Sequence, residues 1–199
     1  MRFIYRAGLV CIGLFLASCA EMPKQAATEL DWQHRAARLS SLSHWNASGK
    51  LAIRTTEQSE SANLEWVQAD KVTRIVLSGP MGLGATSIES DQLQLQISHD
   101  GKTQQYDISS AAASNANIGW DLPIQALPSW ILGLPSPQGK VQGKVIENGL
   151  LRQMEQLGWT VTYESYGQFE QYILPTRMKI ERESTRARLI IRNWTGFSS

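Results

Sequence analysis

Two cysteines are all that the 199 residues contain, and their positions exclude a disulfide-stabilised body. Cys11 lies inside an apolar leader and Cys19 directly after it, so the rest of the chain has no cysteine pair. Histidine is also scarce: none of the three has a second histidine at metal-ligand spacing. The chain lacks a Gly-x-Ser-x-Gly elbow and a complete phosphate-binding glycine motif. We therefore expect neither a bound metal nor an enzyme, and stability from packing.

The chain also lacks an excess of positive or negative charge. Lys and Arg number 19 against 18 Asp and Glu, a formal net charge of +1. Nucleic-acid binding needs a concentrated basic face, and polybasic attraction to a membrane needs clustered cations. Neither is predicted.

Long apolar runs are absent as well, and the run at Ala7–Ala17 is too short for the roughly 20 residues of a membrane span. It follows Arg2 and Arg6, as the apolar part of a secretory leader does. The run ends in Leu16-Ala17-Ser18-Cys19, the pattern of a bacterial lipobox. We expect residues 1–18 to be a lipoprotein signal peptide, cut before Cys19. Cys19 would then carry an N-acyl chain and an S-diacylglycerol, with no other cofactor. An ordinary signal peptide with an accidental cysteine is the alternative.

The segment after the cysteine shows no apolar periodicity, which predicts a flexible tether over residues 19–27. Residues 28–199 have the size of one domain. Thr28-x-x-Asp31 resembles a capping box, and Trp32, Ala36 and Leu39 form one helical stripe. We expect a helix over residues 29–42.

Short alternating segments then predict an antiparallel meander. Asp100-Gly101 and Asn148-Gly149 are typical of two-residue hairpin turns. Residues 167–174 are interpreted as an aromatic loop before Pro175. Eleven strands are expected, at residues 47–56, 62–68, 71–78, 86–89, 92–98, 102–108, 140–147, 150–156, 158–166, 177–183 and 186–194.

Two further helices are expected, at residues 109–118 and 123–132. Pro128 is tolerated only in a first turn, so the regular part of the second helix is Leu127–Leu132. Gly133 and Pro135 are typical of a helix end.

Two features point beyond ordinary packing. The turn Ser78–Ala85 carries Met81 and Leu83 among glycines and a proline, although loop tips are normally polar. Their side chains either fold back onto the core or protrude into lipid or a partner. Residues 127–135 are apolar nearly all round, which is typical of a buried helix or of a lid over a cavity.

Four segments resemble the LolB family of outer-membrane lipoprotein receptors, in order along nearly the whole body. They are Trp45-x-x-x-Gly49-Lys50-Leu51-Ala52-Ile53-Arg54, Gly79-Pro80-Met81-Gly82, Trp130-Ile131-Leu132-Gly133-Leu134-Pro135 and Arg188-Leu189-Ile190-Ile191-Arg192-Asn193-Trp194. The resemblance implies a half-open, incomplete antiparallel β-barrel of about eleven strands, capped by about three helices over an apolar cavity. It implies a monomer, lipid-anchored in the outer membrane and facing the periplasm. Such a receptor accepts acylated lipoproteins from a LolA-type carrier and inserts their chains into outer-membrane lipid.

The resemblance also assigns roles to residues of this chain. The family's protruding loop has a leucine directly after its proline, whereas here Met81 holds that position and Leu83 lies two residues on. Pro80 and Gly82 would shape this membrane-insertion loop. Trp130, Ile131 and Leu134 are expected to form a lid over the acyl chains. The cavity wall is expected at alternating strand positions, Leu51, Ile53, Leu64, Trp66, Ile75, Leu77, Leu93 and Leu95.

Two other interpretations remain open. A lipoprotein that carries a free lipid or glycolipid would share the cavity and would not need the apolar loop tip. A structural outer-membrane lipoprotein would have a solid interior.

Overall fold

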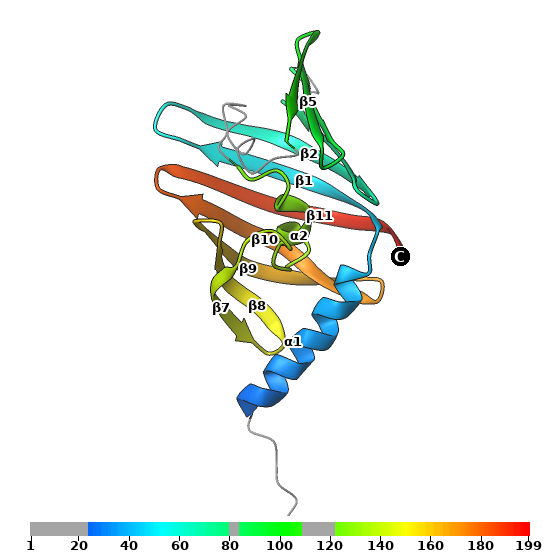
Figure 1. Ribbon diagram of the computed structural model, residues 1–199, viewed down its shortest axis with the longest axis vertical. Helices are drawn as coiled ribbons and strands as arrows, with labels where there is room; N and C mark the ends of the chain where they lie inside the picture. The colour runs from blue at the N-terminus through cyan, green and yellow to red at the C-terminus, as the bar shows by residue number, and fades with distance from the viewer. Residues whose placement is uncertain (1–23, 80–83, 109–121) are drawn as a thin grey trace, which may run out of the picture.

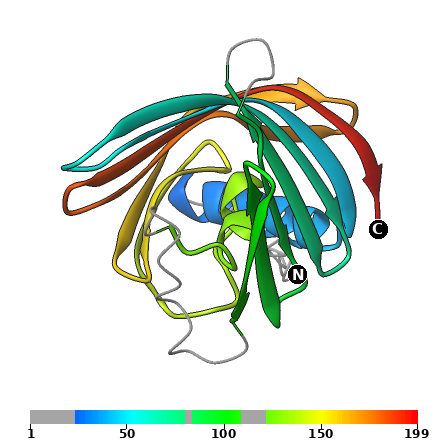
Figure 2. The same ribbon diagram turned by 90° about the horizontal axis from the view of Figure 1, so that it is seen from above.

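The computed structural model describes residues 24–79, 84–108 and 122–199 (Figure 1). In these ranges, eleven strands form one curved antiparallel sheet, and two helices lie on its concave side (Figure 2). The helices are α1 (Lys24–Ser40) and α2 (Leu127–Ile131). The strands are β1 (His44–Arg54), β2 (Ser59–Ala69), β3 (Val72–Ser78), β4 (Thr86–Ser90), β5 (Gln94–His99), β6 (Lys102–Asp107), β7 (Val141–Glu147), β8 (Leu150–Gln156), β9 (Trp159–Phe169), β10 (Tyr172–Arg182) and β11 (Thr185–Ser198).

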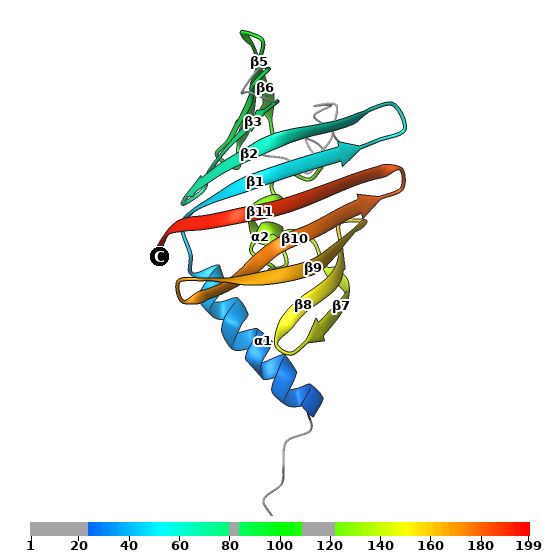
Figure 3. The ribbon, with the colours of Figure 1, turned by 180° about the vertical axis from the view of Figure 1, so that it is seen from behind.

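The sheet is a half-open barrel. Its strand order is β6-β5-β4-β3-β2-β1-β11-β10-β9-β8-β7, so β6 and β7 are its two edges. Two meanders therefore meet in the middle, where β1 pairs with β11 (Figure 3). The predicted half-open antiparallel fold of eleven strands is confirmed. Two of the three expected helices are present, and the one expected at 109–118 lies outside the described residues.

The central pairing between β1 and β11 depends on one glycine. The register shifts between Ser48 and Gly49, which marks a β-bulge. A Cβ atom at Gly49 would lie 1.9 Å from the carbonyl oxygen of Ile190. No side chain fits there, so the two halves of the sheet can join only at a glycine.

The two hairpin turns predicted from the sequence have the expected backbone conformation. Asp100 and Gly101 have φ of 48° and 73°, and Asn148 and Gly149 have 51° and 71°, as type I′ hairpins require. Helix α2 ends as predicted at Gly133, with φ of 79°. The Gly133 amide donates to the Trp130 carbonyl, and the Leu134 amide donates to that of Ser129, which is a Schellman motif.

Two predictions of local structure were wrong. Residues 167–174 are not a loop: β9 continues to Phe169, and β10 begins at Tyr172. Pro175 does not end the strand because the β9–β10 register shifts beside it, and a bulge tolerates a missing amide donor. Helix α1 begins at Lys24, inside the segment interpreted as a tether.

The core fills the space between the concave face and the helices. Trp45 is fully buried in it, and its ring centroid lies 5.4 Å from that of Trp66 and 5.2 Å from that of Trp194. These rings come from β1, β2 and β11, so aromatic packing reinforces the junction of the two meanders.

Candidate functional site

Strand alternation directs most of the predicted wall positions into the concave face. Of these positions, Leu51 is half-buried, and six more have at most 4% of their surface exposed. The buried set is Ile53, Leu64, Trp66, Ile75, Leu77 and Leu95. The inner surface of β1–β5 is therefore apolar through its middle, and Gln68, Thr73 and Ser90 place polar side chains at one end of it.

Leu93 is the exception, and the structure corrects its assignment to the wall. It is 61% exposed and lies in the β4–β5 turn, one residue before β5 begins. The Asp91 carboxylate accepts hydrogen bonds from the amides of Leu93 and Gln94, and Gln92 has φ of 76°. This Asx turn interrupts the alternation that the sequence indicated, so Leu93 points away from the interior.

A small hollow lies between this wall and the segment that leads into α2. Its volume is about 30 Å³, and it is lined only by apolar side chains. We call it the central hollow, and its lining residues are Leu51, Leu64, Trp66, Ile75, Leu77, Ile88, Leu122, Ile124, Leu127, Ile180 and Leu189. Apolar hollows of this size stay dry, and ligand pockets are normally some ten times larger. The central hollow is therefore too small for a ligand in this structure.

A second space, which we call the mouth pocket, opens at the C-terminal end of β1. Its volume is about 340 Å³, and it shares Leu51 and Leu77 with the central hollow. Gly79 and Gly84 also line it. These two glycines flank the predicted insertion loop, whose Pro80, Met81, Gly82 and Leu83 lie outside the described residues, as does Cys19.

Helix α2 is attached to one side of the barrel by directed hydrogen bonds. The Trp130 indole donates to Gln156 Oε1 at 2.9 Å, and the Tyr163 hydroxyl donates to the Trp130 carbonyl at 2.8 Å. Gln156 is fully buried on β8 and also accepts from the Ser136 amide at 2.9 Å. Its Nε2 donates to three carbonyls, those of Ser136, Gln138 and Gly139. One glutamine thus fixes α2 and the loop after it to β8.

The residues predicted as a lid therefore occupy a different place. Trp130 and Ile131 are at most 1% exposed and do not line the central hollow. Leu134 lines a pocket at the N-terminal end of β1. The side chains that close the hollow opposite the strand wall are Leu122, Ile124 and Leu127.

Helix α1 is held by two arginines. The Arg35 guanidinium donates to the Ile173 carbonyl, and Arg38 Nη2 donates to that of Gln171 at 3.1 Å. Both acceptors lie at the β9–β10 turn. The Arg35 guanidinium also lies 5.2 Å from the centre of the Tyr166 ring. These contacts fix α1 to the same side of the barrel as α2.

Burial shifts the pKa values of Arg35, Tyr163 and Tyr166. Loss of hydration lowers the pKa of Arg35, although the adjacent tyrosines oppose the shift. Burial also raises the pKa of both Tyr163 and Tyr166 above the usual value of 10.0. The Tyr166 hydroxyl donates to the Leu151 carbonyl, so both phenols serve as neutral donors.

Sequence reasoning missed Gln156, Tyr163 and Arg35. A glutamine at a strand end and an arginine on a helix are both expected to be exposed to solvent. For Gln156, the only available signal was its place in the strand. It follows Leu151 and Met154 along β8, and these three residues are buried although buried and exposed residues do not alternate strictly there.

The architecture defines the class of protein: a half-open antiparallel β-barrel, in which one curved sheet wraps an apolar interior. A LolA superfamily protein from Nitrosomonas europaea matches with a TM-score of 0.52 and 10% identity, over 84% of this chain and 93% of the other. A protein domain from Vibrio parahaemolyticus, named for outer-membrane lipoprotein sorting, matches with a TM-score of 0.55 and 10% identity, over 87% and 92%. At this identity the likeness concerns the fold alone.

Sequence relatives then identify the family. The family model described as "Outer membrane lipoprotein LolB" matches residues 43–194. An outer-membrane lipoprotein LolB from Chromohalobacter salexigens is 34% identical over 94% of this chain and 88% of its own length. The LolB of Stutzerimonas stutzeri is 31% identical over 92% of each chain. The chain belongs to the LolB family, and the predicted role of an outer-membrane lipoprotein receptor in lipoprotein localisation is confirmed.

In the part of the chain that the structure describes, no helix has the length and apolar character to cross a membrane.

Proposed function

We propose that the protein is anchored in the outer membrane by acylated Cys19, faces the periplasm, and accepts lipoproteins from a LolA-type carrier. It then places their acyl chains in outer-membrane lipid. Family membership and the fold support this proposal. The single observation that carries it is the apolar interior, in which a dry hollow separates the β1–β4 wall from the segment leading into α2.

The physical need for such a receptor follows from the hydrophobic effect. Three acyl chains carry on the order of 45 methylenes, and each contributes about 0.8 kcal/mol, so exposing them to water costs roughly 35 kcal/mol. A lipoprotein cannot cross an aqueous compartment against that cost. Transfer between progressively more favourable apolar sites needs no nucleotide hydrolysis, because only differences in affinity drive it.

Acceptance requires the central hollow to widen, since about 30 Å³ does not hold an acyl chain. The seam that can widen lies between the β1–β4 wall and Leu122, Ile124 and Leu127. All the side chains that line it are apolar. Separation therefore breaks only the hydrogen bonds from Gln125 Nε2 to the carbonyls of Ile108 and Gln92, among those that the described residues form across the seam. An acyl chain entering the seam would replace the lost contacts with its own.

The loop between β3 and β4 is assigned to delivery. Met81 and Leu83 would enter the bilayer and lead the chains out through the mouth pocket, because Gly79 and Gly84 line that pocket. Methionine is flexible and apolar, so it suits a lipid-facing tip. Replacing Met81 and Leu83 by Glu is expected to leave acceptance intact and to slow release into vesicles at least severalfold. Val67→Glu with Val145→Glu, which also replaces two exposed apolar residues but away from the mouth pocket, is the matched control. Normal release from the loop variant would contradict the assignment.

The experiment that tests the function is a transfer assay in purified components. A lipoprotein–LolA complex is mixed with this protein lacking its acyl anchor, and the cargo is followed by co-purification. We expect the cargo to move to this protein and then to vesicles of outer-membrane lipid. Cargo that stays on the carrier would reject the receptor role. Binding of free phospholipid without acceptance of lipoprotein would favour a lipid carrier instead.

A further inference from the structure

A third space, which we call the far pocket, opens at the N-terminal end of β1, at the opposite end of the strand from the mouth pocket. Its volume is about 490 Å³, within the usual range of small-ligand sites. Apolar residues of three segments line part of it, namely Leu39, Leu42, Trp45, Ile124, Leu132 and Leu134. Neither the family resemblance nor the lipid-transfer chemistry assigns this pocket a ligand.

The far pocket adjoins the central hollow. Ile124 lines both, just as Leu51 and Leu77 line both the hollow and the mouth pocket. The three spaces therefore follow one another along the inner face of β1, from Trp45 to Ile53. An acylated molecule in the hollow would reach both ends of this path.

The polar groups of the far pocket are mostly neutral. Amide and hydroxyl side chains line it from Ser40, Gln68, Thr73, Ser90, Gln92, Gln125, Ser129 and Gln138, and the charged lining residues are Asp70 and Lys71. Gln138 Nε2 donates to Gln125 Oε1 at 2.7 Å, so these two neutral amides are fixed to each other at the pocket. Neutral donors and acceptors above an apolar floor match an extended peptide, whose main chain presents both kinds of group.

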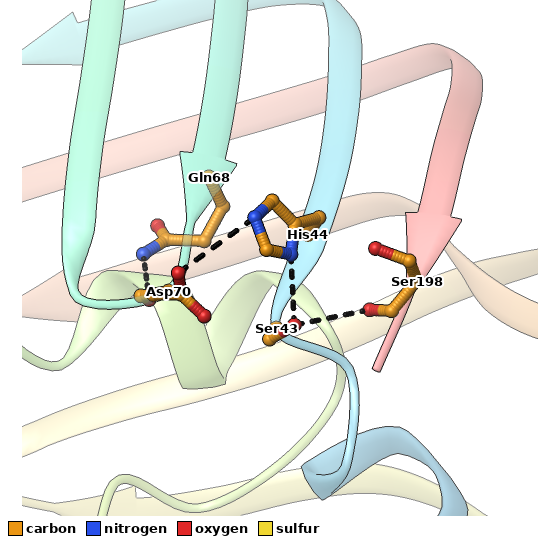
Figure 4. A network of polar contacts seen from close by, with 5 residues as sticks. All are labelled: Ser43, His44, Gln68, Asp70 and Ser198. Atoms are coloured by element: carbon orange, nitrogen blue, oxygen red, sulfur yellow. Dashed lines mark hydrogen bonds and ion pairs between the residues drawn. The ribbon is translucent and has the colours of Figure 1, made fainter.

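One wall of the pocket is held in place by a polar network (Figure 4). Gln68 donates to the Asp70 carbonyl at 2.9 Å and accepts from the Thr73 hydroxyl at 2.8 Å. The His44 imidazole lies 3.8 Å from the Asp70 carboxylate, and the Ser43 hydroxyl lies 2.8 Å from His44 Nδ1. The Asp70 amide also donates to the Ser43 carbonyl at 2.8 Å, and this main-chain bond fixes the β2–β3 turn to the start of β1.

We propose that the far pocket binds the main chain of the peptide segment that follows the acylated cysteine of a cargo lipoprotein. The proposal rests on the receptor function. The acyl chains leave towards the bilayer through the mouth pocket, so the peptide occupies the opposite end. Main-chain recognition lets one receptor serve cargoes whose side chains differ, because every peptide presents the same donors and acceptors.

Two synthetic ligands test the proposal on the full folded body. One is a dipalmitoyl-glyceryl cysteine methylamide, and the other carries four further residues, Ser-Ser-Asn-Ala. We expect the longer ligand to bind about tenfold more tightly, the size of one or two net hydrogen bonds. N-methylation of its peptide bonds should remove that advantage, and changing its side chains should not. Equal affinity for both ligands would overturn the proposal, whereas failure to bind either would reject the receptor function itself.

Variants locate the effect. Gln92→Met and Gln138→Met together change two exposed rim residues, and Gln33→Met on α1 is the control away from the pocket. The double variant should bind the longer ligand as weakly as the methylamide and leave methylamide affinity unchanged. Equal weakening of both ligands would count against the proposal.

Crosslinking gives an answer that does not depend on variants. A diazirine on the second peptide residue should label the far pocket at 68–73 or 124–138. Labelling at Ile53 to Ala62, which belongs to the mouth pocket, would overturn the proposed orientation.

Discussion

The two halves of the sheet hold the helices in different ways. Strands β7–β10 bind α2 through Gln156 and Tyr163, and bind α1 through the carbonyls that accept from Arg35 and Arg38. Across from them, among the described residues, β1–β4 meet α2 and the segment before it through apolar side chains. The polar link on that side comes from Gln125, whose Nε2 donates to the Ile108 carbonyl at 2.6 Å.

This difference shows which part of the molecule can move. Hydrogen bonds require fixed distances and angles, whereas apolar contacts tolerate sliding and replacement by another apolar group. We therefore regard β7–β11 with both helices as the frame, and β1–β6 as the wall that moves. The central hollow lies at the boundary between the two.

The largest effect is expected from breaking the frame at Gln156. Gln156→Met keeps the side-chain volume but leaves the Trp130 indole and the Ser136 amide without acceptors. The free energy of unfolding should fall by about 3 kcal/mol or more, since each buried unpaired donor costs about 1–3 kcal/mol. Urea unfolding measures this, with Gln153→Met on the same strand as the control. A loss of the same size in both variants would mean that the bonding network is not the cause.

The second-largest effect is expected from high pH, which should destabilise the frame. The buried phenols of Tyr163 and Tyr166 have a raised pKa, so they stay protonated in the folded state after the unfolded chain has begun to ionise. Their stability contribution is complete below about pH 10 and is lost as the pH rises above it. A loss of about 2 kcal/mol is expected near pH 11. Urea unfolding near pH 9 and pH 11, with tyrosinate absorbance, measures it. Tyr163→Phe with Tyr166→Phe should flatten this dependence; an unchanged slope would contradict the assignment.

Filling the central hollow should reduce ligand binding and leave the hydrogen bonds of the frame intact. Ile88 lines the central hollow, and Ile88→Phe places extra volume in it. Affinity for the dipalmitoyl methylamide should fall about tenfold, with a stability change of about 1 kcal/mol. Val145→Phe, at a residue 48% exposed, provides the control. Undiminished binding by the Ile88 variant would show that the acyl chains lie elsewhere.

The smallest effect is expected from releasing the moving wall. Gln125→Met removes the hydrogen bonds from Gln125 to the carbonyls of Ile108 and Gln92 and the one that it accepts from Gln138, and should cost about 1 kcal/mol. Hydrogen exchange should become faster in β5 and β6 but not in β8 and β9, and the methylamide should load faster. Gln105→Met on β6 is the matched control. Faster exchange in both halves alike would remove the distinction between frame and wall.

Much of the fold could be predicted because its signals are local. The alternation of Leu95 and Ile97 with glutamines, and the turns at Asp100-Gly101 and Asn148-Gly149, each involve a few neighbouring residues. The turn at Glu170 carries no glycine, asparagine or proline, and Pro175 lies in a strand at a bulge. A sequence pattern alone therefore placed a loop where two strands continue.

The site could be predicted only in outline. Period-two patterns show which side of β2 or β3 is apolar, but they do not show how completely side chains fill the space between elements. Gln156 became important only when the fold brought the Trp130 indole and the Ser136 amide to it. Leu93 had the right residue type and spacing, and the Asx turn at Asp91 excluded it from the interior.

The pairing of β1 with β11 has a consequence for how the molecule is made. Ala47 on β1 cannot meet Trp194 on β11 until the nine strands between them have been synthesised. Contacts so distant along the chain form slowly, because their loop entropy is lost before they give any stability in return. The unfinished polypeptide thus exposes the edges of two incomplete meanders, and this is the period in which a chaperone would protect it.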